Sequence, residues 1–288
     1  MVNTTQTTAV ALLVALLALC HPSAAAAVTA RSITDFDIVQ FALNLEYLEA
    51  NFYSCAVYGV PISSSLTGGG PVPTGCKKAS LSPSALAYAR DIATDEIAHV
   101  AFLRAALMSF NVTPVAQPQI DIGVAFANAA NAAFNTTLSP SFSPYGSDVL
   151  FFLGSYIFED VGATAYLGAI PLIQNNGVLS AAAAIMAVEA YHAGAVRTKL
   201  YDSIDEYLFP YGVTTNVIVQ KISALRDAAG MTKIDAGLQV KGMLNLVPVD
   251  KNSLLFSRTP AQVLAIVSLG GAGNKGGFFP KGMNGYIA

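Results

Sequence analysis

Two histidines, each paired with a glutamate, are the residues of this sequence whose spacing is best suited to chemistry. His99 lies three positions after Glu96, and His192 lies three positions after Glu189. The chain of 288 residues has only three histidines and six glutamates, so chance rarely produces this spacing twice. On a helix, the spacing places both side chains of a pair on one face, one turn apart. That face is otherwise apolar, and a buried carboxylate and imidazole are costly unless they are paired or bind a metal ion.

Two further glutamates extend this pattern into an internal duplication. Glu46 is followed by Tyr53 seven positions later, and Glu159 is followed by Tyr166 at the same distance. One glutamate followed by a Glu-x-x-His motif therefore occurs twice along the chain. A pair of metal ions bridged by carboxylates needs one glutamate from each of two helices and a Glu-x-x-His motif from each of two others. The predicted metal ligands are Glu46, Glu96, His99, Glu159, Glu189 and His192.

The donor types of this set predict two iron or two manganese ions. Carboxylate oxygens with one imidazole per metal suit these ions better than zinc, which favours a closed tetrahedron of four ligands. Glu49 lies one turn from Glu46 and is the alternative ligand on the first helix. The duplication favours Glu46, because Gly162 occupies the position equivalent to Glu49. Glu49 is then expected to lie behind the ligands or to face solvent.

Four more residues near these motifs have two interpretations each. Tyr53 and Tyr166 either support the ligands through hydrogen bonds or electron transfer, or are core tyrosines with satisfied hydroxyls. Arg104 and Arg197 each follow a motif glutamate by eight positions. They either offset the negative charge of the site or stabilise helix C-termini.

The elements that must position these residues are helices. Apolar residues recur at helical spacing through the middle of the chain, and Ser82-Pro83 and Thr259-Pro260 are typical helix starts. No stretch shows a persuasive strand alternation. Long connections rich in proline and glycine occupy residues 59–80 and 111–147. We predict helices over residues 35–58, 83–110, 124–134, 147–169, 178–207 and 215–229, with a short one from 260.

Short, long and short connections between four long helices predict an all-α four-helix bundle with one crossover between its second and third helices. The chain resembles ferritin-like dimetal-carboxylate proteins, in the secreted branch of plant desiccation-related proteins and fungal stress proteins. The segments that carry the resemblance are FALNLEYLEANFY (41–53), DEIAHV (95–100), RTPAQVL (258–264) and GGFFP (276–280). The resemblance spans residues 33–285 and implies the same six metal ligands. We expect the bundle over residues 33–210 and a C-terminal extension over 211–288 that packs on it.

The N-terminal residues 1–26 are predicted to be a signal peptide, with an apolar run followed by small residues. Secretion places the protein outside the cell, with the cell wall or apoplast as one destination. Cys55 and Cys76 are then the only cysteines of the mature chain and are candidates for a disulfide. Asn111 and Asn135 begin sequons for N-glycosylation.

The composition excludes several classes of protein. With 53% hydrophobic and 11% charged residues the chain is not disordered, and with 15 Lys and Arg and a net charge of −3 it is not suited to bind nucleic acid. Apart from the N-terminal run, the apolar residues suit a helical core better than a membrane span. The expected partners are metal ions and small oxidants; the sequence does not define an oligomeric state.

Two functions of different classes fit these residues. The first is redox chemistry at a di-iron or di-manganese centre acting on O2, peroxide or Fe(II), for example peroxide dismutation or ferrous-iron oxidation. It rests on the family resemblance rather than on particular residues. The second is a non-enzymatic, extracellular, stress-protective protein whose metal site only braces the bundle or is vestigial. Iron storage is disfavoured, because the long loops over 59–80 and 111–147 do not suit a cage.

Overall fold

The structure, a computed structural model, describes residues 31–288; the predicted signal peptide lies outside this range. Seven α-helices account for most of the described chain, and the only strands there are four of two residues each. The all-α prediction is therefore confirmed. The helices are α2 (Asp35–Tyr58), α3 (Pro83–Ser109), α4 (Val124–Phe134), α5 (Asp148–Ala169), α6 (Asn176–Asp202), α7 (Thr215–Gly230) and α8 (Pro260–Val267).

Each bundle helix begins at a residue whose side chain caps it. Thr34 and Asp37 form a reciprocal capping box at the start of α2. Ser82 and Ser147 accept backbone N–H groups at the starts of α3 and α5, and Asn175 does so for α6. These side chains satisfy N–H groups that have no partner within the helix. The helix starts predicted from such residues are correct to within two positions.

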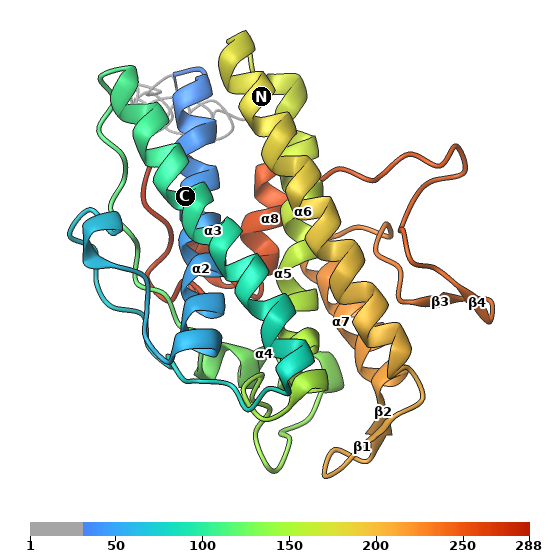
Figure 1. Cartoon of the computed structure of the whole chain (residues 1–288). Coiled ribbons are helices and arrows are strands. Elements are labelled where there is room, and N and C mark those ends of the chain that lie inside the picture. Colours follow the sequence, from blue (N-terminus) through green and yellow to red (C-terminus); the bar gives the residue numbers. More distant parts are fainter. Residues whose placement is uncertain (1–30) are drawn as a thin grey trace, which may run out of the picture. The chain divides into compact units, whose positions relative to one another are not determined.

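The long helices pair in sequence order, and a long crossover joins the two pairs. In the described unit, α2 packs along α3 and α5 packs along α6, with α2 and α5 also in contact (Figure 1). Residues 110–147, which include α4, connect α3 to α5, whereas a single 3-10 turn (Ile170–Leu172) separates α5 from α6. Most residues of α2 and α5 are buried, so these two helices form the centre of the bundle.

The C-terminal extension is fastened to the bundle by a buried network of arginines and aspartates. Arg197 on α6 and Arg226 on α7 both contact Asp160 on α5, at 2.8 and 3.0 Å. Asp235 forms ion pairs with both Arg226 and Arg258. Buried charges of this kind are tolerated only when they are paired and hydrogen-bonded. The predicted boundary at residue 210 stays a prediction.

Two details of the C-terminal half differ from the sequence prediction. The helix predicted to run to residue 207 ends at Asp202. Beyond it, the N–H groups of Ile204 and Glu206 bond to carbonyl groups three residues back, as in turns, instead of four residues back. The carbonyl groups of the same two residues accept the N–H groups of Asn216 and Thr215 at the start of α7. Two short hairpins were also not predicted: β1 (Tyr207–Leu208) pairs with β2 (Val213–Thr214), and β3 (Gln239–Val240) pairs with β4 (Met243–Leu244).

The connection between α2 and α3 is tied to the bundle by a disulfide. Cys55, fully buried on α2, forms the predicted bond with Cys76. Of the described helices, α6 alone is long and apolar enough to cross a membrane by length and composition. It also carries Glu189 and His192 and packs along α5.

Candidate metal centre

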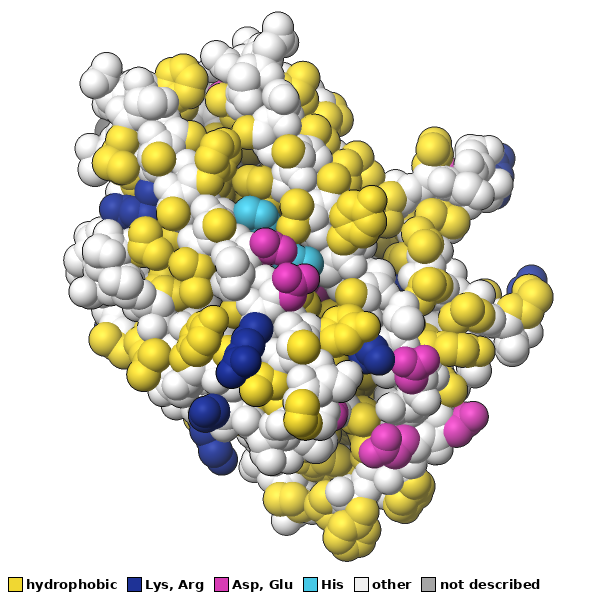
Figure 2. All heavy atoms as spheres, viewed as in Figure 1, with side chains coloured by type: hydrophobic (Ala, Val, Ile, Leu, Met, Phe, Trp, Pro, Cys, Tyr) yellow, Lys and Arg dark blue, Asp and Glu magenta, His cyan; other side chains and the backbone are white. Residues whose placement is uncertain are grey.

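The six predicted ligands meet between the four long helices. Glu46 comes from α2, the first Glu-x-x-His motif from α3, Glu159 from α5 and the second motif from α6. Each of the six residues is at most 9% exposed. Figure 2 shows the two histidines of the described chain at the surface of one face, directly beside acidic side chains. The centre is thus buried, with its histidine edge closest to solvent.

The ligands form two overlapping groups that share two carboxylates. The first group is Glu46, Glu96, His99 and Glu189, and the second is Glu96, Glu159, Glu189 and His192. In each group, one donor atom per residue lies within 4.8 Å of all the others. Glu96 and Glu189 belong to both groups, which is the arrangement that two metal ions bridged by carboxylates require.

The two histidines present the same ring nitrogen to the carboxylates. Nδ1 of His99 lies 3.2 Å from Oε2 of Glu46 and 3.8 Å from Oε2 of Glu96. Nδ1 of His192 lies 3.2 Å from Oε1 of Glu96 and 3.5 Å from Oε2 of Glu159. The two carboxylate oxygens of Glu96 therefore face different histidines, so this one side chain joins the two groups.

Several donor atoms of the centre have no hydrogen-bond partner among the described residues. Both carboxylate oxygens of Glu96 and of Glu189 are buried and unpaired, as are Oε2 of Glu159 and Nδ1 of His192. Buried polar atoms in this state are rare and costly. A pair of divalent ions would satisfy them, and its charge of +4 would balance the four glutamates. The residues present thus fit a dimetal group.

Protonation in the metal-free centre reflects the same crowding. Burial, reinforced by the charge of Glu96, raises the pKa of Glu46 to about 7. Burial opposes the charged form of His99, but its hydrogen bond to Glu46 and the nearby charges of Glu46 and Glu96 outweigh it and raise the histidine pKa to about 10. Burial and the neighbouring carboxylates also raise the pKa of Glu189 well above its usual value. The metal-free centre therefore holds protons where metal ions would bind.

The two tyrosines of the duplication cross between the central helices. The hydroxyl of Tyr53 on α2 donates to Oε1 of Glu159 on α5. The hydroxyl of Tyr166 on α5 donates to Oε1 of Glu46 on α2. Each tyrosine thus orients the glutamate of the other helix, which favours the supporting role over that of an ordinary core residue.

Glu49 is buried beside the centre but belongs to neither ligand group. Burial and the nearby carboxylates, Glu96 foremost, raise the pKa of Glu49 well above its usual value. The equivalent position on α5 is Gly162, and the space that this glycine leaves is taken by Glu189. A Cβ at position 162 would lie 2.3 Å from Oε2 of Glu189 and 3.5 Å from Oε1 of Glu49.

Asp95 is a member of the site that the sequence analysis missed. Its Oδ2 lies 3.1 Å from Nε2 of His192, and its side chain is 43% exposed. A carboxylate at this nitrogen fixes the ring orientation and leaves Nδ1 free as a ligand. The signal in the sequence was its place directly before Glu96, but its partner lies 97 residues away, and only the fold brings them together.

Of the two interpretations of the arginines, the stabilisation of helix C-termini is wrong, and the offset of the site's charge stays a prediction. Arg104 donates to the hydroxyl of Tyr47 at 2.6 Å, and that hydroxyl in turn donates to the carbonyl groups of Leu66 and Val115. Arg197 belongs to the network with Asp160. Neither lies in the last turn of its helix. Both join loops or the extension to the bundle instead.

Asn111 and Asn135 are both exposed on the crossover connection, and their glycosylation stays a prediction.

Comparison with known proteins gives three findings. A ferritin-like domain model matches residues 34–202. The chain is 35% identical over 244 residues to the desiccation-related protein PCC13-62 of Craterostigma plantagineum, covering 80% of this chain and 76% of that protein. It is 30% identical over 268 residues to the ferritin-like catalase Nec2 of Nesocodon mauritianus, covering 88% of this chain and 85% of that protein. No solved structure matches.

Proposed function

Because this chain belongs to the ferritin-like family, in the branch of desiccation-related proteins, we propose that it is a secreted enzyme with a di-iron or di-manganese centre. Among O2, peroxide and Fe(II), we propose hydrogen peroxide as the substrate. Support for peroxide comes from the similarity to a protein named as a ferritin-like catalase. The reaction is 2 H2O2 → 2 H2O + O2, and it would serve protection against oxidative or desiccation stress.

The observation that carries this proposal is the pair of four-residue groups that share Glu96 and Glu189. Both ions would be held by these two carboxylates. Glu46 with His99 would complete the ligand set of one ion, and Glu159 with His192 that of the other. When bound, such a pair would supply two-electron redox chemistry, which the disproportionation of peroxide requires.

The remaining residues of the site would hold these ligands in place and admit the substrate. The phenol of Tyr53 orients Glu159 through a hydrogen bond, and that of Tyr166 orients Glu46. Asp95, half-exposed, orients His192 and marks the side on which the centre approaches solvent. A small polar molecule such as peroxide would enter there, since this edge combines histidine and carboxylate groups (Figure 2).

One observation also favours a second function, in which bound metal only braces the fold. The unpaired carboxylate oxygens of Glu96 and Glu189 destabilise a metal-free bundle, so metal binding alone would stabilise it. An extracellular protein that protects through its own stability would need bound metal but no catalytic turnover.

The test is to purify the secreted protein without chelator, measure its metal content, and follow O2 release from peroxide. We expect about two iron or manganese ions per chain and turnover, both lost in Glu96→Ala. The matched control is Glu206→Ala, which removes an exposed glutamate and should change neither. Loaded protein without turnover would favour the bracing function; a chain that binds neither metal would contradict both.

A further inference from the structure

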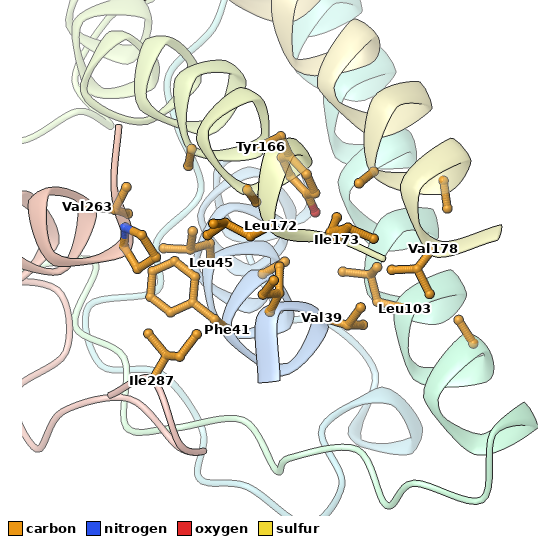
Figure 3. A pocket seen from close by; sticks show the side chains of 18 of the residues that line it. Val39, Phe41, Leu45, Leu103, Tyr166, Leu172, Ile173, Val178, Val263 and Ile287 are labelled. Atoms are coloured by element: carbon orange, nitrogen blue, oxygen red, sulfur yellow. The ribbon is translucent and has the colours of Figure 1, made fainter. Parts of the chain in front are cut away.

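A large apolar cavity opens at one end of the bundle. Its volume is about 110 Å3, and its walls come from both helix pairs and from the C-terminal extension. The close-up view shows side chains of these elements turned toward one another around the space (Figure 3). Representative wall residues are Val39, Leu45, Leu103, Ile173, Val178 and Val263.

The wall offers a ligand at most one free polar group, the Nε of Arg258. Tyr166 and Arg258 supply its only polar side chains. The hydroxyl of Tyr166 is already bonded to Glu46, and the guanidinium of Arg258 is bonded to Asp235 and Thr164. Among the buried polar atoms of the described residues, those of Tyr166 all have a hydrogen-bond partner. In Arg258, only Nε lacks one. A charged or strongly polar molecule would lose its hydration here and gain at most one hydrogen bond.

Exposed apolar side chains continue the wall to the surface. Phe102, Phe110 and Leu172 line the cavity and are 48%, 44% and 49% exposed. Exposed apolar residues grouped around a concave apolar space mark a binding site more often than scattered ones do. The cavity is therefore accessible to a molecule that arrives from solvent.

We propose that this cavity binds an uncharged, apolar small molecule with about the bulk of a benzene ring or a short alkyl chain. An apolar cavity of roughly 150 Å3 lined by similar residues stays dry and takes up benzene in another protein. The space here is of comparable size, and its wall is equally apolar. This binding site is separate from the proposed peroxide chemistry and does not depend on it.

The cavity shares one residue with the metal centre. Tyr166 forms part of the wall, and its hydroxyl donates to Glu46, one of the predicted ligands. A molecule in the cavity would therefore lie one side chain away from the centre. Occupancy would restrict the Tyr166 ring and, through it, the Glu46 carboxylate.

The experiment is a calorimetric titration of the purified secreted chain with benzene. We expect saturable binding at one site per chain. Ala181→Leu fills the cavity from a half-buried wall position on α6 and should weaken binding by roughly tenfold or more. Ala184→Leu makes the same change at an exposed position of the same helix that does not line the cavity, and it should bind as the wild type does.

A second matched pair protects this test against a folding defect. Ala106→Leu fills the cavity from α3, and Ala105→Leu is its exposed neighbour outside the wall. Circular dichroism checks that each variant is folded. A wild type that shows no saturable binding, or filling variants that bind as well as their controls, would overturn the proposal. Because no turnover is measured, a failed peroxide assay leaves this result untouched.

Discussion

Asp95 makes the two halves of the centre chemically different. It contacts Nε2 of His192, whereas the equivalent position before Glu189 is Val188. One predicted metal position thus has a carboxylate behind its histidine, and the duplication does not repeat it. Such partners raise the basicity of the ligand and hold its ring in place.

We therefore expect Asp95→Val to weaken metal binding by roughly 10- to 100-fold at one of the two positions. Asp95→Asn should bind more tightly than Asp95→Val, because the amide oxygen can still accept the Nε2–H group. Competition with a chelator measures both affinities. Asp91→Val, an exposed aspartate one turn earlier on α3, is the control. Equal affinities in Asp95→Val and the wild type would contradict this role.

Gly162 is the second residue whose identity the centre depends on. An added methyl group would lie 2.3 Å from Oε2 of Glu189, a distance that real contacts do not tolerate. We expect Gly162→Ala to displace this carboxylate and to reduce the bound metal measured by elemental mass spectrometry.

Gly194 on α6 provides the control, because a Cβ there meets nothing within 4 Å. Gly194→Ala should keep its metal and raise the free energy of unfolding by about 1 kcal/mol through helix propensity. Loss of metal from both variants, or from neither, would show that the space at position 162 is not what matters.

At the scale of the elements, the helices were predictable because their starts carry local signals. Ser82 with Pro83 and Thr259 with Pro260 cap their own helices, so the neighbouring sequence suffices. The end of α6 was not predictable, because the turns that follow it are bonded to the first turn of α7, which comes later in the chain. The strands of the two hairpins have two residues each and are too short to show an alternating pattern.

The same distinction separates the predicted and the missed parts of the site. The glutamates and histidines were found because each Glu-x-x-His motif lies within a single helix and the whole pattern occurs twice along the chain. Asp95 was missed because its contact with His192 exists only when α3 and α6 lie together. The contacts of Arg197 with Asp160 and of Arg104 with Tyr47 were missed for the same reason, since the partners are distant in sequence.

The disulfide is the covalent restraint on the connection between α2 and α3. Cys55 and Cys76 are 21 positions apart, and a loop of this length contributes about 3 kcal/mol in the chain-entropy account. We expect the Cys55→Ala/Cys76→Ala variant to lose about that much free energy of unfolding in urea denaturation. Its metal content should not change, since the predicted ligands lie on helices. A double variant as stable as the wild type would contradict this contribution.

For the whole molecule, the buried carboxylates predict how stability depends on pH. The metal-free native state holds the proton of Glu46 up to about pH 7, whereas an unfolded chain releases it near 4.5. His99 keeps its proton to about pH 10 instead of 6.5, so its stabilisation is complete below 6.5 and lost as the pH rises through 10. In both cases the native state binds more protons than the unfolded state, and stability falls as pH rises.

We expect the metal-free protein to lose about 2.5 kcal/mol of unfolding free energy between pH 5 and 8 from Glu46 alone. The loaded protein should not show this loss, because metal ions bind the deprotonated ligands and gain affinity as pH rises. Chemical denaturation at several pH values, with and without metal, measures both curves. A metal-free protein that becomes more stable from pH 5 to 8 would contradict the raised carboxyl pKa.

Both halves of the centre lie within one chain, and this has a consequence for how the protein can change. Had two identical copies of a shorter chain each supplied half of the ligands, every substitution would appear in both halves at once. Here Glu49 in the first half corresponds to Gly162 in the second half, and Asp95 corresponds to Val188. Such unequal pairs can arise only where the halves are encoded separately. One half is thereby free to specialise while the other keeps the ligands in place.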